Sequence, residues 1–213
     1  MSKPRVLLAD DHRILAEGLR SLLEPEFEVV GVVADGRELV GLARKLRPDV
    51  IVADVTMPSL NGIEAAQQLR SLGVKAKVVF LTMHNDVAYA RRALEAGGSG
   101  FVLKHSATTE LVTAVREALR GQTYVAPMIA GELLRSYRDG KANINDDSHG
   151  LTPRQREVLQ LLAEGRSAKE VGAALRISTR TAEFHKARIR EALGLQSTAE
   201  LVQYAVRHGI VSI

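Results

Sequence analysis

Five side chains that can do chemistry stand at the ends of apolar runs in the first half of this sequence. They are two adjacent carboxylates, a third carboxylate, a hydroxyl and an ammonium group: Asp10, Asp11, Asp54, Thr82 and Lys104. In an open parallel sheet, residues just beyond the carboxyl ends of the strands line the ligand crevice. We therefore expect these side chains to gather at one edge of a sheet, where a ligand would bind.

The three carboxylates of this set predict a cation site. Carboxylates that lie close together repel one another, so a cation is needed to keep all three ionised. Because the set offers oxygen ligands and neither His nor Cys, Mg²⁺ is favoured over zinc or copper. Two histidines near this edge, His84 and His105, suggest a transition metal as the alternative, but no paired ligand spacing supports it.

The same groups suit phosphoryl chemistry. Asp54 could act as a nucleophile toward a phosphoryl group, with Mg²⁺ and Lys104 neutralising the transferred oxygens. Taken singly, each residue has an ordinary explanation, because an aspartate at a strand end is commonly solvated and a lone lysine commonly lies on the surface. The coincidence of all five residues with strand ends favours the functional interpretation.

Alternating strands and helices must position these groups. Short apolar runs rich in β-branched residues alternate with stretches in which apolar residues recur at helical spacing. This alternation predicts an α/β domain with a flavodoxin-like, doubly wound parallel sheet of five strands, interleaved with five helices. The expected strands are Val6–Ala9, Val29–Val33, Val50–Asp54, Lys77–Thr82 and Gly100–Lys104.

The C-terminal part of the sequence predicts an all-α domain of four helices. Capping boxes at Thr152, Ser167 and Ser197, each with Gln or Glu three residues later, mark three helix starts. The second and third helices are separated only by residues 176–178, which is the short turn of a helix-turn-helix. The expected helices are Pro153–Glu164, Ala168–Leu175, Thr179–Leu193 and Thr198–His208.

The third of these helices carries a basic outer face. Ala182, Ile189 and Leu193 form its apolar stripe, and Phe184 lies off that stripe. A basic helix surface fits the major groove of double-stranded DNA, where phosphates supply affinity and base edges supply specificity. A solvated amphipathic helix is the alternative. The residues expected to contact DNA are Arg180, Thr181, Glu183, Phe184, Lys186, Ala187, Arg188 and Arg190.

Composition agrees with this division of the chain. The 213 residues carry a net charge of +4, and 10 basic against 6 acidic residues fall in 151–213. There is no cysteine, which excludes disulfides and thiolate metal sites. Without a long uncharged apolar run or a signal-peptide pattern, we expect a cytoplasmic protein with no membrane partner. The expected domains are 1–124 and 151–213, joined by a linker at 125–150 that contains a short helix.

Residues 4–122 resemble the receiver domain of bacterial response regulators. The match rests on the acidic pair Asp10-Asp11, the segment Asp54–Pro58, and the single residues Gly62, Thr82, Phe101 and Lys104. The resemblance implies that Asp54 is the phosphoacceptor. It also implies a switch, in which Thr82 moves its hydroxyl to the new phosphoryl oxygen and Phe101 turns into the space vacated.

The receiver resemblance also implies the metal ligands. Asp11 would bind Mg²⁺ directly with Asp10 close by, and Asp54 and the backbone carbonyl of Thr56 would complete the contacts. Many receivers have proline after the active-site lysine, whereas this sequence has His105. If the bond from Lys104 to His105 is cis, as the resemblance implies, it is an uncommon non-proline cis bond.

Residues 151–213 resemble the LuxR-type DNA-binding domain over its full length. Its motifs include Leu151–Leu159, Gly165, Lys169–Val171, Ile177-Ser178, His185 and Leu193-Gly194. Together the two parts resemble a NarL/FixJ-type response regulator. That resemblance implies a partner histidine kinase, homodimerisation through the last helix and control of transcription. Two roles stay open for Glu183, a contact with a cytosine amine and an ion pair with a neighbouring arginine.

Two other functions are compatible with these residues. The C-terminal domain could bind DNA without phosphorylation, with the receiver as a protein-interaction module. The sheet edge could also belong to a small phosphatase with an aspartate nucleophile. Such enzymes need a second acid two residues after the nucleophile, and that position is Thr56. The leading hypothesis is therefore a phosphorylation-controlled transcription factor.

Overall fold

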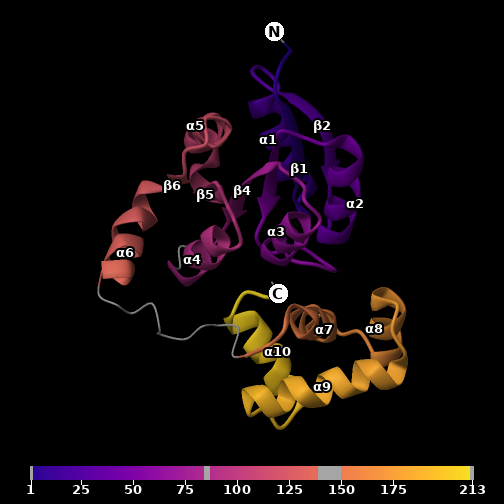
Figure 1. Ribbon diagram of the computed structural model, residues 1–213. Helices are drawn as coiled ribbons and strands as arrows, with labels where there is room; N and C mark the ends of the chain where they lie inside the picture. The colour runs from indigo at the N-terminus through magenta and orange to yellow at the C-terminus, as the bar shows by residue number, and fades with distance from the viewer. Residues whose placement is uncertain (1, 84–86, 139–149, 212–213) are drawn as a thin grey trace. The chain divides into compact units, whose positions relative to one another are not determined.

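The computed structural model describes residues 2–83, 87–138 and 150–211 (Figure 1). The chain divides into two compact units, an α/β unit and a unit built from helices α7 to α10. His84 and the polar stretch 139–149, which the sequence predicts as a linker, lie outside the described residues. None of the helices within the described ranges combines the length with the apolar composition that a bilayer-spanning helix needs.

A parallel sheet in the order β2-β1-β3-β4-β5-β6 forms the centre of the α/β unit. The predicted fold class is confirmed, but the prediction of five strands was wrong. The sixth strand is only two residues long, which is too short for an alternating pattern to appear in the sequence. The strands are β1 (Arg5–Ala9), β2 (Glu28–Val33), β3 (Val50–Asp54), β4 (Lys77–Thr82), β5 (Gly100–Leu103) and β6 (Tyr124–Val125).

Helices cover both faces of this sheet (Figure 1). Alternate strand residues, among them Val6 and Leu8, share one hydrophobic core with α1 and α5. On the other face, a Cβ atom at Gly31 would lie 3.1 Å from both Leu7 and Leu42 of α2, so this helix packs directly on the strands. The helices are α1 (Arg13–Leu23), α2 (Gly36–Leu46), α3 (Gly62–Ser71), α4 (Val87–Glu95) and α5 (Ala107–Leu119), with a short 3-10 helix at Lys104–Ser106.

A further helix, α6 (Pro127–Arg138), follows β6. The short helix predicted within 125–150 is present: Tyr124 pairs with Gly100 in the sheet, and the helix starts three residues later. Proline is well tolerated in the first turn of a helix because its missing N–H would have no partner there. Ile129 and Leu133 are buried, and α6 packs against α4.

The second unit has one hydrophobic core, and the apolar faces of its four helices supply it. The predicted helices are confirmed to within one residue at each end. Thr152 and Ser167 form complete capping boxes. The box predicted at Ser197 is only half formed, because the Glu200 carboxylate accepts from the Gln196 backbone N–H at 2.7 Å instead. The helices are α7 (Pro153–Ala163), α8 (Ala168–Leu175), α9 (Thr179–Leu193) and α10 (Thr198–Arg207).

The turn between α8 and α9 explains a glycine in the middle of α8. The Ile177 N–H donates to the Gly172 carbonyl at 2.9 Å, which folds the turn back onto the helix. A Cβ atom at Gly172 would lie 2.9 Å from the Ile177 carbonyl oxygen. A side chain there would push the turn away, so the lower helix propensity of glycine is offset by this close approach.

Candidate functional site

Three buried charged side chains meet at the carboxyl edge of the sheet. Asp10 follows β1, Asp54 ends β3 and Lys104 follows β5, and their exposed fractions are 2%, 3% and 7%. Ala9 is in register with Ala53, so Asp10 and Asp54 extend from neighbouring strands at the same level. The parallel order of the sheet thus brings together residues that lie far apart in the sequence, as predicted.

Lys104 connects the two carboxylates. Its Nζ donates a hydrogen bond to Asp54 Oδ2 at 2.8 Å, and it lies 2.8 Å from Asp10 Oδ2 in an ionic contact without hydrogen-bond geometry. Burial raises the pKa of Asp54 to about 6, although the Lys104 ammonium opposes this shift. Burial by itself would lower the pKa of Lys104, but the attraction of its ammonium group to the Asp54 and Asp10 carboxylates outweighs burial, so that pKa is raised.

Backbone groups fix the orientation of the carboxylates. The Thr56 N–H donates to Asp54 Oδ1 at 3.2 Å, and the His12 N–H donates to Asp10 Oδ1 at 2.9 Å. Gly62 lets α3 begin directly against this turn, since a Cβ atom there would lie only 2.1 Å from the Asp54 carbonyl oxygen. The loop after β3 is therefore closed tightly around the Asp54 side chain.

The acidic groups at this edge are suited to a divalent cation. Ligand atoms of Asp10, Asp11, His12 and Asp54 all lie within 4.8 Å of one another. Asp10 Oδ2 and Asp11 Oδ1 are buried and accept no hydrogen bond in the described part of the chain. Three carboxylates against one ammonium leave an excess of negative charge, which a hard cation with oxygen ligands would balance.

His12 belongs to this cluster and was not foreseen from the sequence. Its Nδ1 lies 3.0 Å from Asp11 Oδ1, while its side chain is 64% exposed. The only sequence signal was its place directly after the acidic pair. His12 adds a nitrogen atom to a set predicted to offer oxygen alone, but the three carboxylates dominate the site and still favour Mg²⁺.

The remaining receiver residues are buried beside this edge. Thr82 ends β4 and Phe101 lies within β5, and both are fully buried, while Thr56 is 9% exposed. The sequence left open whether the bond between Lys104 and His105 is cis; it is trans, and the described residues contain no cis peptide. The short 3-10 helix that begins at Lys104 gives a trans chain the turn it needs after β5.

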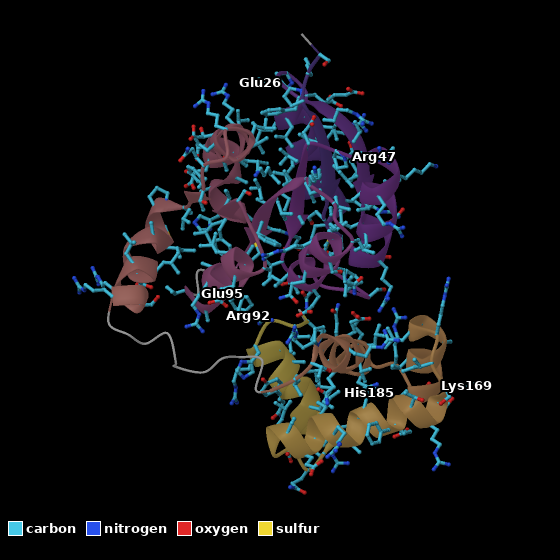
Figure 2. The ribbon with its side chains drawn as sticks, in the orientation of Figure 1. Glu26, Arg47, Arg92, Glu95, Lys169 and His185 are labelled. Atoms are coloured by element: carbon cyan, nitrogen blue, oxygen red, sulfur yellow. The ribbon has the colours of Figure 1, made fainter. Side chains whose placement is uncertain are left out.

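On α9, the predicted apolar stripe faces the core of its unit. Ala182 and Ile189 are buried, whereas Phe184 is 58% exposed. The side chains predicted to contact DNA fall into an exposed group and a partly buried group. Arg180, Glu183, Phe184, Ala187 and Arg188 are exposed, and Thr181, Lys186 and Arg190 are partly buried. Figure 2 draws the side chains of this unit as sticks and labels His185 of α9.

Three of these α9 residues already have intramolecular roles. Thr181 completes the helix cap, because its N–H donates to Ser178 Oγ at 3.0 Å. The Arg190 guanidinium donates to the carbonyls of Leu195 and Gln196, just beyond the helix end. Arg188 bonds to the Glu191 carboxylate at 2.8 Å and also lies 5.7 Å from the centre of the Phe184 ring.

Glu183 makes no ion pair with any arginine in the described part of the chain. The neighbouring Arg188 is instead paired with Glu191 at 2.8 Å. Of the two roles left open by the sequence, the ion pair is therefore not formed. The Glu183 carboxylate is exposed on the outer face of α9, where it can accept a hydrogen bond from outside the protein.

Comparison with known families assigns both units. Residues 6–116 match the family described as "Response regulator receiver domain", and residues 149–205 match "Bacterial regulatory proteins, luxR family". The chain belongs to the LuxR-family response regulators. It is 35% identical to the transcriptional regulatory protein MctR of Rhizobium johnstonii, over 99% of this chain and 96% of that protein.

Solved response regulators are similar along most of the chain. A LuxR-family two-component response regulator from Aurantimonas sp. SI85-9A1 shares 40% identity with a TM-score of 0.61, covering 64% of this chain and 99% of that one. The response regulator RcsB in a complex with DNA shares 28% identity with a TM-score of 0.59, covering 95% of this chain and 98% of that one.

Family membership excludes one of the functions that the sequence left open. The protein is a two-component response regulator with a DNA-binding domain that regulates transcription, and it is not an enzyme. The phosphatase alternative was therefore wrong. The threonine two residues after Asp54, where such enzymes need an acid, agrees with this outcome.

Proposed function

We propose that a partner histidine kinase phosphorylates Asp54 and that this event controls DNA binding by α9. One observation carries the proposal: Asp54 Oδ2 receives a hydrogen bond from the buried Lys104 ammonium at 2.8 Å, beside a cluster of unsatisfied carboxylate oxygens. A buried carboxylate with a fixed cation next to it is poised to receive a phosphoryl group, because the cation neutralises the incoming oxygens.

The proposed transfer proceeds by nucleophilic attack of an Asp54 carboxylate oxygen on phosphorus. The new O–P bond forms as the P–N bond to the kinase histidine breaks, and the electron pair of that bond returns to the imidazole, which takes a proton. Lys104 stays ionised throughout and holds one phosphoryl oxygen. Thr82 would hold another with its hydroxyl, and Phe101 would fill the space that Thr82 leaves.

The metal in this proposal is Mg²⁺, held by Asp10, Asp11, Asp54 and the Thr56 backbone carbonyl. It would neutralise negative charge on the transferring phosphoryl group. Asp10 and Asp11 bind and orient it, and their buried oxygens that accept no hydrogen bond in the described residues support this role. The side chain of His12 is 64% exposed and lies at the side of the cluster that faces solvent, where a phosphodonor would enter.

The output in this proposal is a homodimer that binds two half-sites on double-stranded DNA. The receiver would extend over 1–124 and the DNA-binding domain over 151–213, with 125–150 between them. Dimerisation through α10 would set two α9 helices about 34 Å apart, in successive major grooves. DNA-bound RcsB supports the mode of binding, and the exposed, largely basic face of α9 supports the choice of helix.

Phosphorylation is tested with acetyl phosphate and Mg²⁺, followed by mass spectrometry of the intact protein. The wild type should gain one phosphoryl group, and Asp54→Asn should gain none. Asp49→Asn is the matched control, because Asp49 precedes the same strand at its other end and is exposed. Modification that persists in Asp54→Asn would remove Asp54 from the proposal.

The link from phosphorylation to DNA is tested by genome-wide footprinting of the wild type beside Asp54→Asn. If phosphorylation controls binding, the mutant should lose occupancy at most sites that the wild type occupies. Equal occupancy by both proteins would favour the alternative in which DNA binding is independent of phosphorylation and the receiver is an interaction module.

A further inference from the structure

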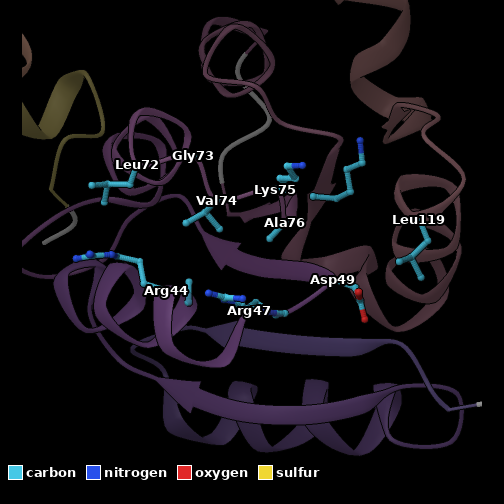
Figure 3. Close-up of a pocket in the computed structure, with 12 residues that line it drawn as sticks. Arg44, Arg47, Asp49, Leu72, Gly73, Val74, Lys75, Ala76 and Leu119 are labelled. Atoms are coloured by element: carbon cyan, nitrogen blue, oxygen red, sulfur yellow. The ribbon is translucent and has the colours of Figure 1, made fainter.

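A pocket of about 730 Å³ opens in the α/β unit, where strands β3 and β4 begin (Figure 3). Its walls come from the end of α2, the segment that leads into β3, the loop between α3 and β4, and Leu119 at the end of α5. The Asp54 cluster lies at the opposite ends of the same strands. The pocket is therefore separate from the proposed phosphorylation site.

Positive charge dominates the lining of this pocket. It contains four cationic side chains and one carboxylate: Arg44, Arg47, Lys75, Lys77 and Asp49. Asp49 Oδ2 already accepts from the Arg5 backbone N–H at 2.7 Å. Within the described ranges, none of the four cations has an ion pair or a side-chain hydrogen bond. Like charges gathered without partners focus a positive potential in the hollow.

Part of this charge has a structural explanation. Cations near a helix C-terminus offset the helix dipole and can donate to its free carbonyls, and Arg44 lies in the last turn of α2. Arg5 illustrates that role, because its guanidinium donates to the Leu46 carbonyl at the end of α2. The four pocket cations make no such bond in the described structure. The helix dipole therefore explains why a cation is favoured at Arg44, but it does not explain why four cations without partners gather here.

We infer that this pocket binds an organic polyphosphate of about nucleotide size. Four unpaired cations against one carboxylate call for a ligand with several negative charges, and a guanidinium matches two phosphate oxygens at once. The volume falls within the range of small-molecule sites, of about 300–1,000 Å³. Apolar groups of Ala43, Pro48, Val74, Ala76 and Leu119 also line the pocket and would contact the organic part of the ligand.

A neighbouring hollow extends the same site. A second pocket of about 320 Å³ shares residues 74–77 with the first and adds Arg70 to its lining. Lys75, in the loop between α3 and β4, and Lys77, the first residue of β4, thus line both pockets. Extended polyphosphates can span such a pair of hollows, which strengthens the preference for several phosphates over one.

The test uses ATP as the probe with the full-length protein in EDTA, so that the carboxylate cluster holds no metal. We expect a dissociation constant below about 1 mM by isothermal titration calorimetry. In amide-resolved NMR, the chemical-shift changes caused by adding ATP should centre on residues 74–77. Tripolyphosphate should bind more weakly than ATP, since it lacks an organic part to contact the apolar lining. Equal affinities would contradict that part of the inference.

The double variant Arg44→Ala/Lys75→Ala should weaken ATP binding about tenfold or more, as expected for loss of charged hydrogen bonds. Lys45→Ala is the matched control, because Lys45 is exposed in the same helical turn but does not line the pocket. The charge-conserving Arg44→Lys/Lys75→Arg should retain most of the affinity, which separates binding from folding. Two results would overturn the inference. One is an equal loss of ATP affinity in Lys45→Ala and the double variant, and the other is chemical-shift changes confined to α9.

Discussion

The negative charge around Asp54 is only partly neutralised by its protein neighbours. Lys104 supplies one positive charge to a site in which Asp10 and Asp54 are both buried and Asp11 is adjacent. The cost of burying Asp54 as an anion appears as a pKa raised to about 6. In the metal-free protein this residue therefore opposes folding at neutral pH.

Replacing the Asp54 carboxyl should stabilise the metal-free protein. Its folded-state pKa of about 6 lies above the ordinary value of 3.8, so the folded protein binds the proton more tightly than the unfolded chain does. Stability consequently falls as pH rises through this window, and the cost persists above it. We expect Asp54→Asn to raise the free energy of unfolding at pH 7.5 by about 1–3 kcal/mol, on the scale of about 1.4 kcal/mol per tenfold change in proton affinity.

Urea unfolding in EDTA at pH 7.5 and pH 4 measures this effect. The gain should largely disappear at pH 4, where the carboxyl is protonated in the folded protein. Asp49→Asn, which changes an exposed aspartate near the other end of β3, should show little difference between the two pH values. A gain of the same size for Asp54→Asn at both pH values would contradict the argument.

Phe184 offers a second prediction at the scale of single residues. Its ring is 58% exposed on α9, and an exposed phenyl group can contact the methyl group of thymine. Phe184→Ala should then lose discrimination at one base pair, by up to about 1 kcal/mol, the scale for burying one methyl or methylene group. Operator duplexes in which one thymine at a time is replaced by uracil, which lacks the methyl group, measure this contact. The wild type should lose affinity for the duplex with uracil at one position, and Phe184→Ala should show no such loss. A loss of equal size in both proteins would exclude the contact.

At the scale of elements, the start of α3 is held against the end of β3 by the absence of a side chain. A Cβ atom at Gly62 would lie 2.1 Å from the Asp54 carbonyl oxygen, which belongs to backbone that cannot easily move. The same approach closes the loop that carries Thr56. The position of Asp54 therefore depends on a helix start as much as on its own strand.

Gly62→Ala should consequently be destabilising, by about 2 kcal/mol or more, within the range known for overpacking. Gly18→Ala is the matched control: Gly18 lies inside α1, and a Cβ atom there would meet nothing within 4 Å. Alanine is the better helix former, so this control should gain up to about 1 kcal/mol. Thermal unfolding of both variants measures the difference, and changes of the same sign would contradict the packing argument.

The elements also show where sequence reasoning succeeds. Asp54 and Lys104 could be placed at one edge because parallel strands bring their carboxyl ends together, whatever the distance in sequence. His12 could not be assigned to the cluster, because its approach depends on the turn after β1. The donor to the Glu200 carboxylate was misassigned by one residue, since alternative local hydrogen bonds have the same sequence signature.

Other features were hidden because they are assembled from several segments. The basic pocket takes its lining from three separate parts of the chain, each of which resembles an ordinary helix end or loop in sequence. The commitment of Arg190 to the carbonyls after α9 likewise depends on how the chain turns at Gly194. Composition marked α9 as basic, but it could not show which of its cations are already bonded.

At the scale of the whole molecule, the charge distribution separates two kinds of polyanion site. The net charge of +4 is not spread evenly, since the excess of basic residues falls at 151–213. DNA binding through α9 should show strong dependence on salt, because each phosphate contact releases counterions. The pocket in the α/β unit, by contrast, should favour a ligand small enough to enter it.

Lys186→Ala should weaken binding to all DNA sequences alike and should reduce the slope of log affinity against log salt by about one. Lys45→Ala, which removes an equal charge from α2 in the other unit, should leave the slope unchanged. Fluorescence anisotropy with one specific and one unrelated duplex, over a range of salt concentrations, measures the affinity and the salt slope for each variant. Binding that does not vary with salt would exclude phosphate contacts as the main source of affinity.

The two-residue strand β6 has a consequence for behaviour at high concentration. An exposed sheet edge can pair with the edge of another molecule and so begin aggregation, and very short edge strands limit this risk. At this edge only Tyr124 and Val125 belong to the ladder, and Pro127, which has no N–H to donate, follows at the start of α6. Strand addition at this side is therefore restricted to a length that gives little stability, which helps to keep the protein from polymerising through its sheet.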